Sequence, residues 1–446
     1  MVPGGARFGG GGPVSGHSRA APPVIARGPV SGGAAPGRGR ISRSGCARVP
    51  RPVISIPRRG AVVQLRRGAP VTEFRFLHTS DLHLGRRFAN IPQPPDGHIR
   101  GRLMAARQDA IGRIAAAARA QGAGHVVVAG DSFDTPTPSA TVLRQSLAAM
   151  GEAEGIDWWL LPGNHDNLRE AEPLWETVTR DGPANVHAVT ETAPVDLGGA
   201  HLLPAPVGFR AEGRDLTAAL PGMATPEGAL RLGLAHGGVV DFTEAGGAVP
   251  PDRDRTAGLD YLALGDWHGR MQVSPRVQYP GSPEQDRFLH GRRGVCLSVT
   301  LPGPGAAPLI EEVETGVFLW AEADLPLRAG QDPAAALAAL LPATGRREIL
   351  QRVRASGWAG LPQQVALSRA ADRAAPEFAH FELRRDGLGT LYDDADLDEI
   401  DRGGALRIAA DRLKAEVDAG PPDSASAQIA GAALARLYAY VREAAE

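Results

Sequence analysis

The stretch FRFLHTSDLH, residues 74–83, decides the fold. Its first seven residues, FRFLHTS, include two Phe, one Leu and one Thr and predict a strand over residues 74–80. Asp81-Leu82-His83 follows directly, so a carboxylate and an imidazole two residues apart stand where the strand ends. Open α/β sheets build their sites in the loops at the carboxyl ends of strands. The stretch therefore predicts an α/β protein with a site at this edge, although a structural turn also fits this pair when taken alone.

Working outward from this stretch, helices and strands alternate along the chain. Helices are expected at residues 102–121 and 139–153, and buried strands at 125–129 and 158–161. After about residue 190, short strands follow one another closely, at 195–197, 201–204, 230–235, 261–264, 294–301 and 309–314. Strands packed in this way indicate a second sheet, so we predict an α/β two-sheet sandwich flanked by helices.

The chain is expected to divide into four regions: a basic leader at 1–70, the sandwich at 71–317, a small α/β module at 318–402 and a helical region at 403–446. A Pro/Gly-containing stretch near 324–332 precedes a helix at 333–341 and strands near 349–355 and 378–384. The last region has two expected helices, 404–417 and 425–443, separated by Gly420-Pro421-Pro422.

The leader contains twelve Arg and no Asp or Glu. It lacks apolar periodicity, so we expect it to be disordered because it cannot bury enough surface to offset its ordering entropy. A basic arm for nucleic acid and a transit-like presequence both fit this composition. We favour a third interpretation, in which the reading frame is over-extended and the natural start lies near Val71.

Charge and cysteine content indicate how the protein can contact phosphate and in which compartment it is expected. Outside the leader, 36 basic and 50 acidic residues leave a net charge of about −14. Any phosphate contact must therefore come from local Arg side chains or from bound metal. Cys46 and Cys296 are far apart, which excludes a disulfide framework and favours a reducing cytosol. We find no apolar run near the length of about 18 residues that a membrane span needs and no signal peptide, so we expect a cytoplasmic protein without a membrane partner.

Four more short motifs follow predicted strands. They are Gly130-Asp131, Gly163-Asn164-His165-Asp166, His236-Gly237 and Gly265-Asp266-Trp267-His268. Each alone fits a turn or a core residue, but together they supply the mixed oxygen and nitrogen donors that two divalent cations need if one carboxylate bridges them. Asp131 is the best candidate for the bridge, because it stands between the Asp81/His83 pair and the later donors.

The order D-x-H, GD, GNHD, H-G and G-x-x-H resembles the calcineurin-like metallophosphoesterases over roughly residues 74–317. More narrowly, HTSDLHLG, AGDSFDTPTPS, PGNHD and YPGSPEQ are similar to the SbcD-type branch of DNA repair nucleases. The protein phosphatases of the superfamily carry an Arg in GDxxDRG where Thr135 stands here.

The resemblance implies a two-metal site and a catalytic histidine. One Mn²⁺ would be held by Asp81, His83, Asp131 and His268, and a second by Asp131, Asn164, His236 and Asp266. His165 would aid the leaving group or the developing charge, and Asp166 would orient it. Family members usually have His where Asp266 stands. A carboxylate can also bind Mn²⁺, so we expect the site to survive with altered affinity or metal preference.

The resemblance also implies a function and partners. The chain would be a Mn²⁺-dependent DNA exo- or endonuclease of DNA repair, with residues 318–402 as a capping domain that shapes access of DNA. Its terminal helices would dock on an SbcC-like SMC-type ATPase, and a homodimer is considered as well. A phosphodiesterase of small nucleotides or lipids is the alternative from another substrate class. A scaffold with a degenerate metal site is the third hypothesis, suggested by Asp266.

Several other residues have two interpretations. Arg86, Arg87, Arg100 and Arg102 could hold a DNA backbone or be solvated surface residues. Trp158 and Trp159 are expected in the core rather than stacked on bases, and His78 in a buried structural role. Ala430, Ala433, Leu434 and Leu437 fall near helical spacing and would face either the partner ATPase or the chain's own body.

Overall fold

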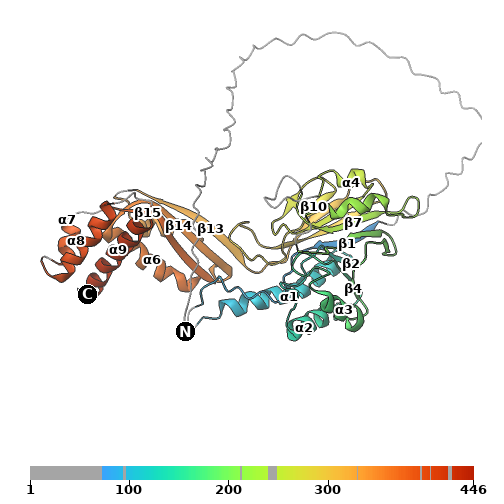
Figure 1. Cartoon of the computed structure of the whole chain (residues 1–446), viewed down its shortest axis with the longest axis horizontal. Helices are drawn as coiled ribbons and strands as arrows, with labels where there is room; N and C mark the ends of the chain where they lie inside the picture. The colour runs from blue at the N-terminus through green and yellow to red at the C-terminus, as the bar shows by residue number, and fades with distance from the viewer. Residues whose placement is uncertain are drawn as a thin grey trace, which may run out of the picture. The chain divides into compact units, whose positions relative to one another are not determined.

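The computed structural model describes residues 73–93, 97–210, 213–239, 249–328, 330–391, 394–401, 403–419 and 424–445. By its internal contacts the chain separates into residues 1–66 and 67–446. The predicted leader, residues 1–70, lies outside the described residues. Many of the helices and strands of the second unit are labelled in Figure 1.

Six strands form the first sheet, in the order β12-β11-β1-β2-β3-β4. Their bounds are Phe74–Thr79 (β1), His125–Val128 (β2), Asp157–Leu160 (β3), Val186–Ala188 (β4), Val295–Leu301 (β11) and Leu309–Glu314 (β12). Strands β1 to β4 run parallel and are linked by α1 (Ile99–Ala120), α2 (Ala140–Gly151) and α3 (Glu172–Asp181). The predicted elements of this part occur within a few residues of their expected bounds, and α3 and β4 are additional.

The prediction that strands β11 and β12 belong to a second sheet is wrong. Strand β11 pairs antiparallel with β1, with Phe74 opposite Leu301 and His78 opposite Leu297, and β12 continues the same sheet beyond β11. All but one of the β11 residues are buried, which suits a strand with a neighbour on each side. β11 and β12 follow the strands of the second sheet in the sequence, so the sequence did not reveal that the chain returns to the first sheet.

The second sheet has the order β5-β6-β7-β8-β10-β9. Its strands are Val195–Asp196 (β5), His201–Ala205 (β6), Arg231–His236 (β7), Tyr261–Gly265 (β8), Met271–Gln272 (β9) and Val277–Tyr279 (β10). Strands β6, β7, β8 and β10 run parallel to one another in this order. Strands β9 and β10 were not predicted, because two or three residues are too few to show a period.

The two sheets pack face to face, which confirms the predicted sandwich. Phe76 and Val127 of the first sheet share one buried cluster with Leu232 and Tyr261 of the second. Helices α1, α2 and α3 cover the other face of the first sheet (Figure 1), with Ile111 and Trp175 among the buried residues there, and the segments η1 (Leu216–Gly222) and α4 (Arg253–Thr256) lie beside the second. The central strands of each sheet are thereby buried on both faces, whereas β12 at the edge of the first sheet is mostly exposed.

A third sheet follows, with three parallel strands in the order β13-β14-β15. Its elements are β13 (Leu319–Leu327), α5 (Pro333–Leu340), β14 (Ile349–Gly360), α6 (Leu361–Ala374) and β15 (His380–Leu391). Helices α5 and α6 cover one face, where Leu337 and Leu367 pack against Val353. Strand β13 was missed because it contains Pro326, which an edge strand tolerates. The limits of this module, and the other predicted domain limits, stay predictions.

The third sheet is anchored to the sandwich by an apolar cluster. The cluster joins the loop and helix after β1 to the start of β13 and β14, through Phe88, Ile91, Ile99, Leu103, Ala106, Phe318, Trp320 and Leu350. Buried Glu284 adds a polar link, since its carboxylate accepts the backbone N–H groups of Val317 and Phe318 at 2.8 and 2.9 Å.

The last part of the described chain contains α7 (Asp394–Ile400), α8 (Ala405–Asp418) and α9 (Ala425–Ala445). Ala430 and Leu434 of α9 are buried against the neighbouring helices, Leu437 is half-buried and Ala433 is exposed. The apolar face expected on this helix therefore contacts the chain's own body.

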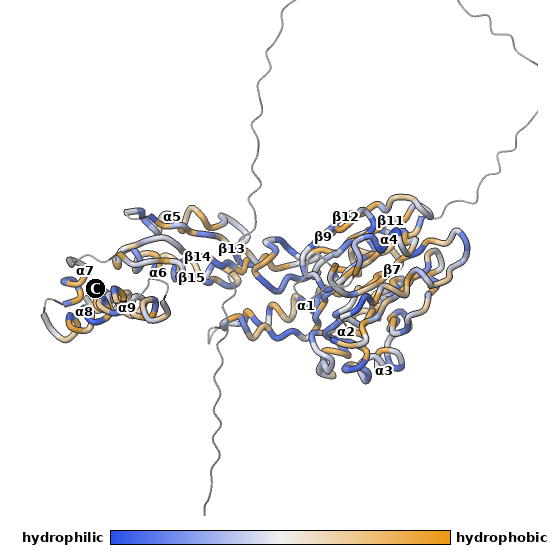
Figure 2. The backbone as a smooth tube through the Cα atoms, turned by 45° about the horizontal axis from the view of Figure 1, so that its top comes forward, coloured by the Kyte–Doolittle hydropathy of each residue, from blue (hydrophilic) through white to orange (hydrophobic). Residues whose placement is uncertain are grey.

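Polar and apolar residues are interspersed along the helices (Figure 2). None of the described helices is both long enough and apolar enough to cross a membrane.

Candidate metal centre

The ends of five parallel strands bring the predicted site residues together. Strands β1, β2 and β3 of the first sheet end just before Asp81, Asp131 and Asn164. In the second sheet, β7 ends at His236 and β8 ends just before Asp266. Since the two sheets face each other, donors from both meet at one edge of the sandwich. The seven residues predicted to bind metal converge as the sequence suggested, while their roles as ligands stay predictions.

The backbone at these strand ends is strained. Asp81, His83, Asp131 and Asp266 have φ angles of 54°, 43°, 54° and 95°, in the left-handed region that side chains other than glycine seldom adopt. Asp and His are among the residues that tolerate this region best, but each still costs free energy that the surrounding structure must offset. Such strain at several candidate donors is typical of a functional site.

A first group of donors surrounds Asp81. The Nε2 atoms of His83 and His268 lie 3.1 Å apart, and 3.9 and 3.7 Å from Asp81 Oδ1. All three side chains are buried. Asp131 approaches with its other oxygen, Oδ2, at 3.5 Å from His83 Nε2. Atoms at these separations can share one cation, because two ligands of a single first-row metal lie about 3 Å apart when each bond is about 2.1 Å.

A second group of donors lies on the other side of Asp131. His236 Nε2 is 3.6 Å from Asp131 Oδ1 and 3.7 Å from Asp266 Oδ1. Asn164 Nδ2 donates a hydrogen bond of 2.9 Å to Asp266 Oδ1. The two oxygens of Asp131 thus face two different groups, which is the arrangement expected of a bridging carboxylate.

Buried polar atoms without partners support this interpretation. They include Asp81 Oδ1, His236 Nε2 and Asn164 Oδ1. An orphaned buried acceptor is costly, and bound cations would satisfy these three atoms. The donor set of carboxylates, imidazoles and an amide oxygen fits divalent metal ions such as Mn²⁺.

Glycines before the donors make room for them. A Cβ on Gly163 would lie 2.2 Å from Asp131 Oδ1 and 2.3 Å from the Asp131 backbone nitrogen. A Cβ on Gly130, whose φ is 87°, would lie 2.2 Å from His236 Nδ1. The glycines of these two motifs are therefore required by the close packing of a donor from another strand.

We expect Gly163→Ala to displace the Asp131 carboxylate, because the added methyl overlaps both its side chain and its backbone. Binding of Mn²⁺, measured by calorimetry on the full chain, should weaken by at least about tenfold, as changes next to metal ligands commonly do. Gly222→Ala adds a methyl in open space at an exposed residue without a left-handed φ and is the matched glycine control. Unchanged Mn²⁺ affinity in Gly163→Ala would show that the carboxylate is not a ligand.

His165 lies beside the first group of donors. Its ring is edge-on to that of His83, with 4.6 Å between the centroids. Its Nδ1 is 2.8 Å from the backbone oxygen of Asp134, which can only accept, so Nδ1 carries the hydrogen and Nε2 is free for a substrate. Its backbone N–H donates to Asp131 Oδ1 at 2.9 Å.

Asp166 has a different place from the expected one. Its carboxylate accepts the backbone N–H groups of Gly163 at 2.7 Å and Phe133 at 3.0 Å. Asp166 therefore ties the loop after β3 to the loop after β2, and the ring of His165 is oriented by the Asp134 carbonyl instead. Any influence of Asp166 on His165 acts through the loop backbone.

The imidazoles of the cluster are oriented by oxygens behind them. His236 Nδ1 donates to the carbonyl oxygen of Ala129 at 2.8 Å. His83 Nδ1 lies 3.4 Å from the carboxylate of Asp134, and His268 Nδ1 lies 3.2 Å from both oxygens of Asp286. A hydrogen on Nδ1 leaves the lone pair of Nε2 directed at the donor groups.

Sequence reasoning missed three residues of this surrounding layer. Asp134 belongs to the GDSFD motif and Asp286 directly follows YPGSPEQ, so their positions beside family motifs were a usable signal. Arg107 gave no signal, because it lies within the Ala-rich helix α1. It is buried and donates to the carbonyl oxygens of Asp81, Leu82 and Glu284, which locks two of the loops together.

Arg287 lies against His268. Its guanidinium Nη2 is 2.9 Å from His268 Nδ1 and 3.2 Å from Nε2, and its Nε donates to Asp286 Oδ1 at 2.9 Å. A guanidinium has no lone pair, so the Nδ1 hydrogen of His268 has only Asp286 to accept it. The side chain of Arg287 is 43% exposed and places a positive charge at the edge of the cluster.

Burial and mutual attraction shift the pKa values of the cluster strongly. Burial raises the pKa of the Asp131 carboxyl well above its usual range, whereas it lowers the pKa of His83 to about 3. Burial would also lower the pKa of His236, but the nearby Asp131 and Asp266 outweigh it and raise the pKa to about 9. Burial opposes ionisation of Asp81, yet His268 and His236 keep its pKa below the usual value. Bound cations would stabilise the ionised carboxylates in this buried setting.

The arginines near the first loop make contacts within the protein. Arg86 is paired with Asp134 at 3.2 Å and with Asp286 at 3.3 Å. Arg100 donates to the carbonyl oxygens of Ile91 and Ala89, and Arg102 to that of Arg347. Arg86, Arg100 and Arg102 thus hold loops in place, an interpretation that the sequence did not suggest.

The aromatic and histidine predictions are confirmed. Trp158 is fully buried in the core, while Trp159 is half-buried and stacks on His187 with 4.1 Å between centroids. His78 is fully buried and its Nδ1 is 3.0 Å from the Tyr261 hydroxyl. These residues pack the sandwich.

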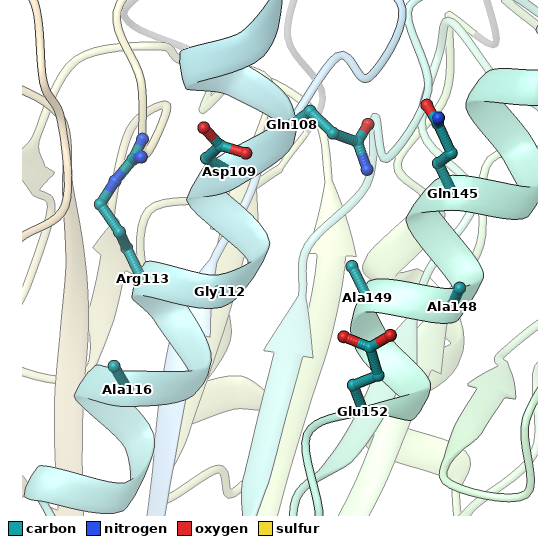
Figure 3. Close-up of a pocket in the computed structure, with 9 residues that line it drawn as sticks. All are labelled: Gln108, Asp109, Gly112, Arg113, Ala116, Gln145, Ala148, Ala149 and Glu152. Atoms are coloured by element: carbon teal, nitrogen blue, oxygen red, sulfur yellow. The ribbon is translucent and has the colours of Figure 1, made fainter.

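A groove of about 650 Å³ lies between α1 and α2, away from the cluster (Figure 3). Gly112, Ala116, Ala148 and Ala149 line it together with Gln108, Asp109, Arg113, Gln145 and Glu152. None of the predicted metal-binding or catalytic residues lines this groove, because those residues follow the carboxyl ends of the strands. The size of a cavity therefore does not locate the candidate site here.

Comparison with known proteins agrees with this geometry. The model of the calcineurin-like phosphoesterase family matches residues 74–257. The uncharacterized metallophosphoesterase YhaO of Bacillus subtilis (strain 168) is 26% identical to this chain over 227 residues, which make up 48% of this chain and 54% of YhaO. The chain thus spans about half the length of this curated relative.

Among solved structures, that of TT1561 of Thermus thermophilus is 14% identical, with a TM-score of 0.35 over 55% of this chain and 100% of that chain. The family match covers the strands β1, β2, β3 and β7, which present five of the seven predicted donors. Residues 74–257 are therefore similar to the calcineurin-like phosphoesterases.

Proposed function

We propose that this protein is a DNA nuclease of the SbcD type, which hydrolyses phosphodiester bonds with two divalent ions, most simply Mn²⁺. The observation that carries the proposal is the bridging position of Asp131 between two donor groups, with His165 beside them. The ions, when bound, acidify a water and neutralise phosphoryl oxygens.

The remaining chemistry belongs to the side chains of this chain. His165 presents Nε2 next to the first donor group, where a proton can be given to the leaving oxygen. Arg287 offers a half-exposed positive charge at the edge of the cluster for a phosphate oxygen. Asp166 and Arg107 hold the loops so that these groups keep their positions. No serine nucleophile is needed in this scheme.

Two features favour DNA over a small ester. The motifs HTSDLHLG, AGDSFDTPTPS and YPGSPEQ are similar to the SbcD branch. The three-stranded sheet after the sandwich is anchored next to the loop of the first motif, through Phe88 and Trp320, so it can limit what reaches the site. The proposed role of this sheet is that of a capping domain.

The proposed partner is an SbcC-like SMC-type ATPase. Because Ala430 and Leu434 are buried within the chain, the partner would contact the exposed side of α9, where Ile429 and Tyr440 are 70% and 54% exposed. These two residues are about three helical turns apart and therefore lie on the same face. A homodimer and a place in cytoplasmic DNA repair belong to the same proposal.

The proposal is tested by incubating the full chain and Mn²⁺ with labelled hairpin, linear and single-stranded DNA, and separately with bis-p-nitrophenyl phosphate. Cleavage of DNA that stops on addition of EDTA is the expected result. Cleavage of the small ester alone would instead indicate a phosphodiesterase of small nucleotides or lipids. Failure to cleave either substrate would indicate a degenerate site.

A further inference from the structure

The two donor groups that share Asp131 differ in composition. The first combines the imidazoles of His83 and His268 with the carboxylates of Asp81 and Asp131, two nitrogens with two oxygens. The second has one imidazole, His236, and oxygens from Asp131, Asp266 and Asn164. The difference arises at Asp266, where a carboxylate stands in place of a further imidazole.

The Asn164 amide connects Asp266 to the second group. Its Nδ2 donates to Asp266 Oδ1 at 2.9 Å, which holds this carboxylate oxygen 3.7 Å from His236 Nε2. The same amide has its carbonyl oxygen buried and without a hydrogen-bond partner. One side chain thus positions a carboxylate and keeps a second oxygen available to a cation.

The partners of the imidazole Nδ1 atoms also favour stronger nitrogen donors in the first group than in the second. His268 Nδ1 is hydrogen-bonded to the Asp286 carboxylate at 3.2 Å, and His83 Nδ1 lies 3.4 Å from the Asp134 carboxylate without a hydrogen bond. His236 has only the neutral carbonyl oxygen of Ala129. A carboxylate partner makes an imidazole a stronger donor, so the first group gains nitrogen-donor strength that the second lacks.

We infer that the two ion positions have different metal preferences: the first favours a transition ion such as Zn²⁺, and the second, because of Asp266, favours a hard cation such as Mn²⁺ or Mg²⁺. Imidazole ligands suit borderline transition ions, and carboxylate and amide oxygens suit hard ions. This inference rests on the two-ion site of the proposed function but does not depend on which phosphodiester is cleaved.

The test measures metal binding without any substrate. Full chain stripped with EDTA is titrated with Zn²⁺ and, separately, with Mn²⁺ by calorimetry, and the ratio of Zn²⁺ to Mn²⁺ affinity is determined for each of the two equivalents. In the parent chain the ratio for the second position should be at least about tenfold lower than for the first. Equal ratios for the two positions would overturn the inference.

The substitution that isolates the effect is Asp266→His. It should raise the ratio of Zn²⁺ to Mn²⁺ affinity at the second position by about tenfold, to near that of the first. The matched variant Asp266→Asn keeps an oxygen donor of similar shape and should weaken both ions while leaving the ratio low. A ratio that does not change in Asp266→His contradicts the inference.

A variant of the first position identifies which ion is which. Asp286→Asn removes the charge behind His268 and should weaken the first equivalent by about 10- to 100-fold, with the second unaffected. If both equivalents weaken equally, the assignment of distinct positions is wrong.

A measurement on the parent chain tests the inference even if the variants do not fold. With Zn²⁺ in the first position and Mn²⁺ in the second, pulsed electron paramagnetic resonance of the Mn²⁺ should detect one coupled imidazole nitrogen. Two coupled imidazoles would overturn the inference. The metal-binding measurements use no substrate. A failure to cleave DNA would therefore contradict the proposed function without changing the result of this test.

Discussion

Replacing Asp131 by alanine should abolish binding of both ions. Its two carboxylate oxygens face different donor groups, at 3.6 Å from His236 and 3.5 Å from His83, so one substitution removes a ligand from each. We expect metal content by elemental analysis to fall from about two ions to below one per chain, and Mn²⁺-dependent cleavage to fall by at least about 10³-fold.

The control for this change is Asp181→Ala. Asp181 is an exposed carboxylate at the end of α3 whose partner is the neighbouring Arg180, so its loss should leave metal content and cleavage as in the parent. Retention of two ions by Asp131→Ala would contradict the bridging role. A thermal melt without metal distinguishes loss of ligands from loss of folding.

The second large effect is expected for His165→Ala, which should keep the metal and lose turnover. The ring of His165 lies beside the first donor group but is oriented by the Asp134 carbonyl through Nδ1, so its removal deletes no ligand of the proposed assignment. General acid catalysis by a positioned histidine contributes about 10²- to 10⁴-fold, and kcat should fall by that amount with Mn²⁺ affinity unchanged.

The measurement is kcat on DNA, alongside Mn²⁺ calorimetry on the same preparation. His98→Ala, at an exposed residue just before α1, is the matched histidine control and should behave like the parent. Cleavage by His165→Ala at the parent rate would remove His165 from the catalytic assignment, whereas loss of Mn²⁺ binding would make it a ligand instead.

The prediction of the fold succeeded where it depended on local patterns. Strand β1 and the Asp81-Leu82-His83 motif after it could be predicted, because the strand and the polar turn are formed by consecutive residues. The position of β11 was not visible, because its apolar sequence fits either sheet and its partner β1 lies far earlier in the chain. Pairing between strands so far apart in the sequence depends on how the rest of the chain packs in the folded protein.

The candidate site divides in the same way. All seven predicted donors converge because each lies at or just after the carboxyl end of a parallel strand, and the order of the motifs along the chain was enough to expect this. The role of Arg107 has no such local signature, and the places of Asp134 and Asp286 beside the motifs do not say which residues they contact. Each reaches a residue on another loop, His83, His268 or Leu82, and only packing of the loops brings the pair together.

The sequence by itself therefore determined the sandwich, the order of its motifs and the residues able to hold metal, because these follow from periodicity and from residue types at strand ends. The tertiary structure alone decided that Asp131 faces two donor groups, that the Asp134 carbonyl rather than Asp166 orients His165, and that Asp266 joins His236 and Asn164. The physical reason is that these contacts join distant segments, whose distances are set by how the two sheets and their loops bury one another.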